Sequence, residues 1–267
     1  MPVKHPRVRP AAVAGYFYPA EPEVLRQSIE DLMDAVEKQQ DSPGALIIPH
    51  AGYIYSGITA AHAYARINSS TGNIKRVVLL GPAHRVYTHG LALSSATHFE
   101  TPLGQIEIDQ EAANLIRDLP QVITSDESHA QEHSLEVHLP FLQCLLGDFK
   151  LLPLVVGDAS PAEVMEVLET FWGDQDTLII ISSDLSHFHD YETACELDKN
   201  TTRLIESLQY EAIGPEQACG CRPMNGLLCL AREKGLGVRT LDLRNSGDTA
   251  GTRDRVVGYG AYAIDSA

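Results

Sequence analysis

Short runs of apolar residues alternate along the chain with stretches of helical spacing. An alanine-rich helix is expected over 58–67, and a second helix has Ser160 as its N-cap and Pro161 in its first turn. Each of these helices lies between two apolar runs that are typical of buried strands: 45–48, 77–80, 151–156 and 178–182. Strand, helix, strand units of this kind predict an α/β fold with a largely parallel sheet.

The remaining elements are less sharply marked. A helix containing Leu25, Ile29 and Met33 follows an aromatic arm at 1–20, which is expected to be ordered and to cover a pocket or the core. Strands are predicted at 91–93 and 105–108, around a turn at 101–104, and at 255–264. Further helices are predicted at 110–118, 134–146, 191–208 and 222–234. Because no repeat, low-complexity tract or linker interrupts the pattern, 1–267 is expected to form a single domain.

Composition narrows the class of protein. The formal net charge is −16 and the chain has no block of Lys or Arg, which argues against nucleic acid as a partner. Apolar stretches are too short to span a membrane, and the first residues lack the apolar core of a signal peptide. Five cysteines, an odd number, fit a reducing compartment. A cytoplasmic globular protein that does not contact membranes is therefore expected.

Titratable side chains follow three of the predicted strands. His50 comes directly after the run at 45–48, His84 after the run at 77–80, and Asp184 and His187 after the run at 178–182. Ligands of open α/β sheets bind outside the carboxyl ends of the strands, so these groups are expected to converge. The pattern favours a metal or catalytic pocket over three unrelated structural histidines.

A thiol extends this candidate site. Cys219 and Cys221 precede a predicted helix, whose N-terminal dipole would stabilise a thiolate. Such a cysteine alone is more often structural, but beside His50 and His84 it makes a His2Cys ligand set that suits Fe(II), Zn(II) or copper. Cys221 lies two residues further on and could replace or assist Cys219.

The stretch 129–138 carries three more histidines. His129 and His133 are four residues apart, but the sequence is not His-Glu-x-x-His, and His138 cannot share one helical face with both. A metalloprotease is therefore disfavoured. Glu132 and His133 are expected to line or brace the pocket, and His138 to be a solvent or packing residue. No Walker loop or Gly-x-Gly-x-x-Gly turn supports a nucleotide cofactor.

Several motifs together resemble the Memo family over nearly the whole chain. They extend from the arm at 14–18 to the glycine-containing strand at 257–261 and include His50-Ala-Gly-Tyr-x-Tyr-Ser-Gly, Gly81-Pro-Ala-His84, Thr101-Pro-Leu-Gly, Glu132-His-Ser-Leu-Glu136, Leu139-Pro-Phe, Ser182-Ser-Asp-Leu-Ser-His187 and Cys219-Gly. One departure is visible, since Phe17 stands where the animal member has tryptophan.

The resemblance implies an αβα sandwich similar to class III extradiol dioxygenases, which hold non-heme iron with two histidines and a carboxylate. In the Memo family the ligand set ends in cysteine, and its positions match His50, His84 and Cys219. Tyr55, Asp184 and His187 match pocket residues of the family. His187 beside Asp184 is then the natural acid/base group, because imidazole titrates near neutrality.

These expectations lead to one main hypothesis and two alternatives. The first is a dioxygenase-like oxidoreductase that uses iron(II), or copper, on a substrate that the sequence does not identify. The second is a non-catalytic protein that binds a phosphopeptide or another ligand in the same pocket. The third is a zinc-dependent hydrolase. The names of microbial family members imply a pathway shared with an AMMECR1-like protein and a radical SAM protein.

Overall fold

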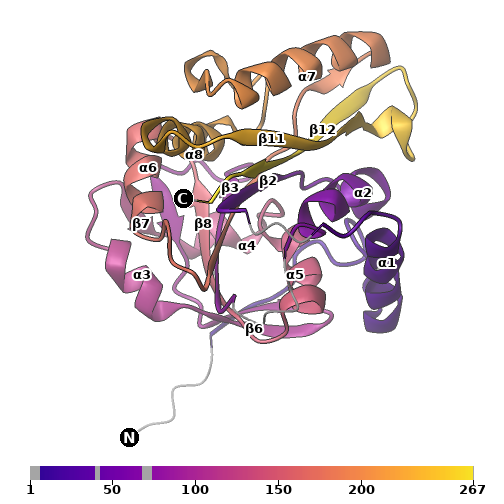
Figure 1. Cartoon of the computed structure of the whole chain (residues 1–267). Coiled ribbons are helices and arrows are strands. Elements are labelled where there is room, and N and C mark those ends of the chain that lie inside the picture. Colours follow the sequence, from indigo (N-terminus) through magenta and orange to yellow (C-terminus); the bar gives the residue numbers. More distant parts are fainter. Residues whose placement is uncertain (1–6, 40–42, 68–73, 267) are drawn as a thin grey trace, which may run out of the picture.

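One sheet organises the molecule. The computed structural model describes residues 7–39, 43–67 and 74–266. Its strands join in the order β1, β5, β6, β8, β3, β9, β2, β12, β10, with β4 beside β8, β7 beside β4 and β11 beside β12 (Figure 1). Their bounds are β1 Val8–Arg9, β2 Ala45–Ile48, β3 Arg76–Pro82, β4 Leu91–Leu93, β5 His98–Thr101, β6 Gly104–Ile108, β7 Val122–Thr124, β8 Lys150–Val156, β9 Thr177–Ser182, β10 His187–His189, β11 Val238–Asn245 and β12 Val256–Ile264.

The centre of the sheet is parallel, and the margin beyond β2 is antiparallel. β3 pairs in parallel with both β8 and β9, and β9 pairs in parallel with β2. β12 then runs antiparallel to β2 and carries β11 and β10 as antiparallel neighbours. The predicted mixed, largely parallel sheet of an α/β protein is confirmed.

Helices cover both faces of this sheet (Figure 1). Leu46 and Ile48 of β2 pack in a core with helices α1, α2 and α5, whereas Ala45 and Ile47 pack in a second core with α3, α6 and α8. The central strands are apolar without interruption because each buries side chains on both faces. The helices are α1 Pro22–Asp34, α2 Tyr53–Tyr64, α3 Gln110–Ile116, α4 Asp126–Ala130, α5 Leu139–Leu146, α6 Pro161–Glu169, α7 Tyr191–Glu206 and α8 Cys221–Lys234.

Local signals explain several helix boundaries. Ser160 caps α6: its hydroxyl accepts a hydrogen bond from the backbone N–H of Glu163, and the Glu163 carboxylate accepts one from the backbone N–H of Ser160. This reciprocal capping box and the following Pro161 set the start of the helix as predicted.

The turn at 101–104 is present, but the strand before it is not the predicted strand at 91–93. The hairpin joins β5 to β6, with Thr101 opposite Gly104, and β4 instead pairs with β8 and β7. The sequence pattern does not predict β1, β5, β7, β10, β11 or α4, which are short elements or, as in β11, a strand rich in charged residues. Short strands of this kind depend on their neighbours more than on their own residues.

The N-terminal arm is tied to the body of the protein from Arg7 onward, whereas residues 1–6 lie outside the described residues. Arg9 is buried and forms an ion pair with the buried carboxylate of Glu136. The same carboxylate accepts hydrogen bonds from the backbone N–H of Ala12 and Val13 and from the Tyr18 hydroxyl at 2.5 Å. The predicted ordered arm is thus present, held by one buried carboxylate.

Within the described part of the chain, no helix combines the length and the apolar composition that crossing a lipid bilayer requires.

Candidate metal centre

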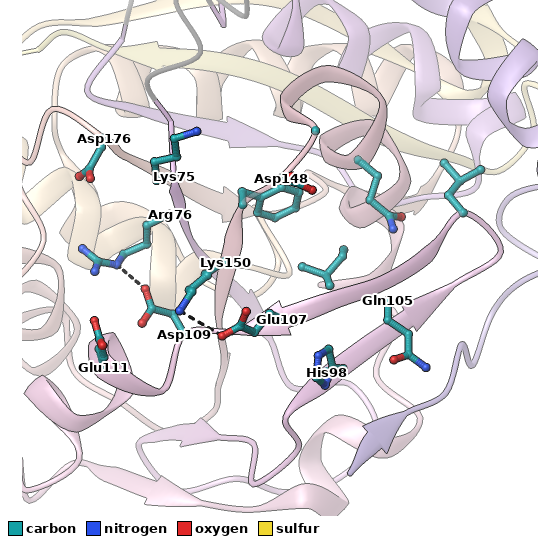
Figure 2. Close-up of a pocket in the computed structure, with 15 residues that line it drawn as sticks. Lys75, Arg76, His98, Gln105, Glu107, Asp109, Glu111, Asp148, Lys150 and Asp176 are labelled. Atoms are coloured by element: carbon teal, nitrogen blue, oxygen red, sulfur yellow. Dashed lines mark hydrogen bonds and ion pairs between the residues drawn. The ribbon is translucent and has the colours of Figure 1, made fainter. Parts of the chain in front are cut away.

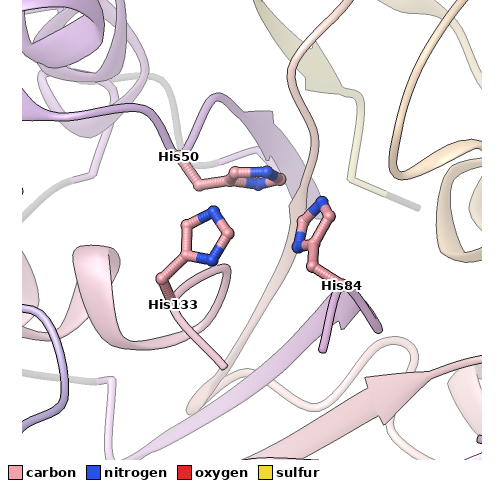
Figure 3. A group of neighbouring side chains, drawn as sticks. All are labelled: His50, His84 and His133. Atoms are coloured by element: carbon pink, nitrogen blue, oxygen red, sulfur yellow. The ribbon is translucent and has the colours of Figure 1, made fainter. Parts of the chain in front are cut away.

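Three imidazoles meet at the carboxyl end of the central strands. His50 follows β2, His84 follows β3, and His133 lies in the loop between α4 and α5. A ring nitrogen from each lies within 4.8 Å of one from each of the others, and the three rings face a common point (Figure 3). Imidazole groups at this spacing can share one metal ion.

Close backbone packing brings the third histidine to the strand ends. A Cβ added at Gly81, near the end of β3, would lie only 2.8 Å from the Ser134 hydroxyl oxygen. Ser134 in turn donates a hydrogen bond to the Pro82 carbonyl at 2.9 Å. The absence of a side chain at Gly81 therefore lets the loop with His133 pack directly on the strand that presents His84.

A buried carboxylate orients His84. Oε1 of Glu132 lies 2.9 Å from Nδ1 of His84, and Oε2 accepts the backbone N–H of the same residue at 2.6 Å. Burial alone would raise the pKa of Glu132, but its hydrogen bonds to His84 and the charge of that ring lower it to about 2. The ionised carboxylate therefore accepts the Nδ1 proton, so that the neutral form of His84 carries its lone pair on Nε2.

His50 is the most buried of the three, with 2 % of its surface exposed. Burial first, and then the neighbouring imidazoles, hold its pKa well below the usual value, so the ring is neutral at pH 7. Its Nδ1 lies 2.6 Å from the Ser182 hydroxyl, and its Nε2 lies 3.4 Å from Sγ of Cys219.

His133, which was expected to line or brace the pocket, is part of the cluster itself. Its ring stacks on His84 with centroids 4.7 Å apart and contacts the ring of Phe17 at the same distance. Its Nδ1 is buried and has no hydrogen-bond partner among the described residues; Oε1 of Glu132 lies 3.3 Å away in poor geometry. Burial lowers the pKa of His133 to about 4. A buried, neutral, unpartnered imidazole nitrogen fits a metal ligand.

Cys219 reaches the cluster on the side of His50. Its sulfur accepts a hydrogen bond from the backbone N–H of Asp184 at 3.3 Å, and its N–H is 3.3 Å from the Asp184 carbonyl. Burial and the Asp184 charge raise the pKa of Cys219 far above its usual range, so the thiol keeps its proton when no cation is near. A bound cation reverses this preference, since metals deprotonate coordinating thiols. The ligand set of His50, His84 and Cys219 stays a prediction.

Asp184 and His187 also lie beside the cluster. Oδ1 of Asp184 accepts the backbone N–H of His50 at 2.8 Å, and burial raises the pKa of Asp184 to about 6. The charge of His187 is close enough to influence the pKa of both His50 and Asp184, while its Nδ1 lies 2.8 Å from the Leu185 carbonyl. The predicted acid/base role of His187 is not tested by these contacts.

Tyr55, another predicted pocket residue, is in the first turn of α2. It lies near Tyr259, a buried residue of β12 that sequence reasoning did not select. Burial, the Asp184 charge and Tyr55 all raise the pKa of Tyr259. Tyr259 is therefore within electrostatic range of both Tyr55 and Asp184.

A pocket of about 450 Å³ opens beside the cluster. His84, Cys219 and Cys221 line it together with Arg85 and Arg222. Cys221, which is buried in the first turn of α8, lines the same pocket as Cys219.

His138 differs most from its prediction as a solvent or packing residue. It is 1 % exposed, and its two ring nitrogens lie 2.8 Å from the Tyr64 hydroxyl and 2.9 Å from the Ser182 hydroxyl. His138 and His50 therefore both contact the Ser182 hydroxyl. No local signal marks this role, because Ser182 is 44 residues away along the chain.

Comparison with known proteins identifies the family. The model of the Memo-like proteins matches residues 9–263. The chain belongs to the Memo-like family. The assignment rests on nearly the whole length and includes all the motifs that carried the resemblance.

Relatives in this family align end to end. A MEMO1 family protein of Aquifex aeolicus is 38% identical, with 95% of this chain and 97% of the relative covered. One from Sulfolobus acidocaldarius is 35% identical, with 94% and 97% covered. Among solved structures, an uncharacterized protein from Escherichia coli K12, JW3007, matches with a TM-score of 0.46 at 11% identity, over 96% of this chain and 99% of that one.

The Memo-like chain has a second and larger pocket, of about 690 Å³, at the opposite end of the central strands. Figure 2 shows charged side chains around it, with Arg76 bound to Asp109 and Lys150 to Glu107. Four of the charged side chains that line this pocket are therefore held in two ion pairs.

Proposed function

We propose that this Memo-like protein is a metal-dependent oxidoreductase whose ion is held by His50, His84 and Cys219. One observation carries the proposal: imidazoles from two strand ends, each with a buried acceptor on Nδ1, lie together with the Cys219 thiol, which is 3.4 Å from Nε2 of His50. Metal-binding histidines usually have such an acceptor on the second ring nitrogen. Iron(II) is the first candidate ion and copper the second, because a thiolate makes the site softer than a carboxylate would.

The residues around the ion have separate tasks in this proposal. Glu132 and Ser182 orient the two histidines, and the ring of Phe17 on His133 covers the cluster from the arm side. Asp184 and His187 are the groups that exchange protons with a substrate in the adjoining pocket. A redox-active ion supplies electron transfer to or from that substrate.

The deciding experiment is metal analysis of protein purified without oxygen. Stoichiometric iron or copper supports the oxidoreductase, and its loss in Cys219→Ala but not in the matched control Cys221→Ala supports Cys219 as a ligand. Loss of the metal in Cys221→Ala but not in Cys219→Ala would assign the ligand role to Cys221. Absence of metal from the wild-type protein, even after addition of Fe²⁺, Cu⁺ or Zn²⁺, contradicts the proposal and favours a non-catalytic binding protein.

A zinc-dependent hydrolase is the second candidate, and the position of His133 favours it. Three imidazoles, as in this cluster, are a common ligand set of catalytic zinc, in which the fourth position holds a water molecule. Stoichiometric zinc that His133→Ala loses and Cys219→Ala retains would support this candidate over the first. Association with AMMECR1-like and radical SAM proteins stays a prediction.

A further inference from the structure

A continuous chain of hydrogen bonds leads from His50 away from the metal centre into the core. The Ser182 hydroxyl oxygen is its central atom, 2.6 Å from Nδ1 of His50, 2.6 Å from the Ser134 carbonyl oxygen and 2.9 Å from Nε2 of His138. Nδ1 of His138 is 2.8 Å from the Tyr64 hydroxyl. All five residues are at most 2 % exposed, so bulk water does not compete for these bonds.

The positions of the protons follow from counting them. Two oxygen atoms 2.6 Å apart need a hydrogen between them, and the Ser134 carbonyl has none to offer. The single hydroxyl hydrogen of Ser182 must therefore point to Ser134. The nitrogens of His50 and His138 that face the same hydroxyl oxygen then have to bring their own hydrogens, one to each lone pair.

The outer part of the chain agrees with this count. Burial lowers the pKa of His138 to about 3, so its ring is neutral and carries only one N–H. With that hydrogen on Nε2, Nδ1 of His138 is an acceptor, and the Tyr64 hydroxyl donates to it at 2.8 Å. Each donor in the chain has one acceptor and each hydrogen has one place.

We propose that Ser182, supported by His138 and Tyr64, is a positioning residue that locks His50 in the Nδ1–H tautomer and so keeps the Nε2 lone pair on the side of Cys219. Two imidazoles donate to one oxygen, so the chain converges on Ser182 instead of running in one direction. Proton transfer along it would require several bonds to reverse together. The network therefore sets the tautomer of His50 and does not relay protons.

The two cluster histidines with identified Nδ1 acceptors are consequently held by different chemistry. Glu132 presents an ionised carboxylate to His84, whereas Ser182 presents a neutral hydroxyl to His50. A neutral acceptor adds no charge to the buried side of the site. The Ser182 hydroxyl specifies the tautomer of His50 only because its hydrogen is donated to Ser134 and its other lone pair accepts a hydrogen bond from His138.

The tautomer can be measured without any metal. In metal-free protein labelled with ¹⁵N at histidine, the two ring nitrogens of each neutral imidazole have distinct chemical shifts for the N–H and lone-pair states. Wild-type His50 should show Nδ1–H alone. Ser182→Ala should give a mixture of tautomers or Nε2–H, and Ser182→Thr, which keeps the hydroxyl, should return His50 toward Nδ1–H. Tyr64→Phe should loosen His138 first and His50 less.

Ser186→Ala is the matched control, because Ser186 is a buried serine like Ser182 but its side chain faces Asp198 and not His50. It should leave the His50 signals unchanged. An Nε2–H state of His50 in the wild-type protein overturns the proposal, and so does a pure Nδ1–H state in folded Ser182→Ala. If Ser182→Ala does not fold, the tautomer of His50 in the wild-type and Tyr64→Phe spectra still tests the proposal.

A second measurement, which rests on the proposed metal site, is the affinity for Zn²⁺ by calorimetry. Ser182→Ala should weaken binding about 10- to 100-fold, the usual effect of losing the partner of a ligating histidine, with partial rescue in Ser182→Thr. Equal affinity in wild type and Ser182→Ala contradicts the positioning role. Failure of the wild-type protein to bind any metal contradicts the proposed function alone, since the tautomer measurement is independent of it.

Discussion

The two ends of the central strands present opposite kinds of polar site. At the amino end, the larger pocket is lined by charged side chains that include two ion pairs, Arg76 with Asp109 at 2.7 Å and Lys150 with Glu107 at 3.0 Å. At the carboxyl end lie three imidazoles and a thiol, from buried His50 to exposed His84, and the buried Nδ1 of His133 has no hydrogen-bond partner among the described residues. An unpartnered buried ligand group therefore points to a candidate site more directly than pocket volume does.

The difference has a physical cause. Hydrogen bonds and the Arg76 charge outweigh burial and lower the pKa of Asp109, so its charged form is favoured. Burial lowers the pKa of His50 and raises that of Cys219, so at the other end the neutral forms are favoured. Neutral nitrogen and sulfur ligands are ready for a cation, whereas paired charges are already satisfied.

The largest effect is expected at the carboxyl end. His50→Ala should abolish stoichiometric metal binding, because it removes a ligand that no other group in the cluster replaces. Metal content after anaerobic purification measures it. His62→Ala is the control, since His62 on α2 faces Asp242 and lies outside the cluster. Retention of metal in His50→Ala would mean that the carboxyl end is not the metal site.

The second-largest effect is expected where Glu136 holds the N-terminal arm against the body of the protein. Glu136→Gln should lower the free energy of unfolding by about 3–5 kcal/mol, because it leaves the buried charge of Arg9 without its counterion. Urea denaturation followed by circular dichroism measures the change. A loss below about 1 kcal/mol would show that the arm is held mainly by its apolar contacts.

A smaller effect is expected at the amino end, where Asp109 both caps α3 and pairs with Arg76. Asp109→Ala should cost about 0.5–2 kcal/mol, the usual range for a lost N-cap, whereas Asp109→Asn retains the cap and should cost less. Thermal or urea unfolding of the two variants measures the difference. Equal losses would show that the ion pair, and not the cap, carries the contribution.

The pH dependence of the same residue has a definite sign. The pKa of Asp109 is lowered in the folded protein, so its contribution is present above the pKa of the unfolded chain and is lost as the pH falls through the folded value. The stability difference between wild type and Asp109→Asn should therefore shrink below about pH 4. A difference that is constant from pH 7 to pH 2 would contradict this.

The smallest effect is expected for the exposed pair of Lys150 and Glu107, beside the same pocket. Lys150→Gln should leave both metal content and thermal stability unchanged within error, because solvent and salt screen this ion pair. A clear loss of either would show that the amino-end pocket has a role that its paired charges do not reveal.

Much of the fold could be predicted from local patterns. β2 was placed at its observed bounds of Ala45–Ile48, because an uninterrupted apolar run closed by proline is typical of a strand buried on both faces. The capping box at Ser160 likewise placed the start of α6. The pairing of β5 with β6 and the existence of β11 could not be predicted, since short or charged strands are decided by their neighbours.

The sequence by itself therefore determined which strands carry His50, His84 and Asp184, because strand order and polarity bring groups that follow parallel strands to one edge of the sheet. Only the tertiary structure decided that His133 joins the cluster and that His138 stands behind Ser182. Both lie in the segment between α4 and α5, whose position depends on Gly81 and on hydrogen bonds to distant residues. Periodicity reports only which side of its own element a residue faces, so contacts between separate segments become visible when the chain is folded.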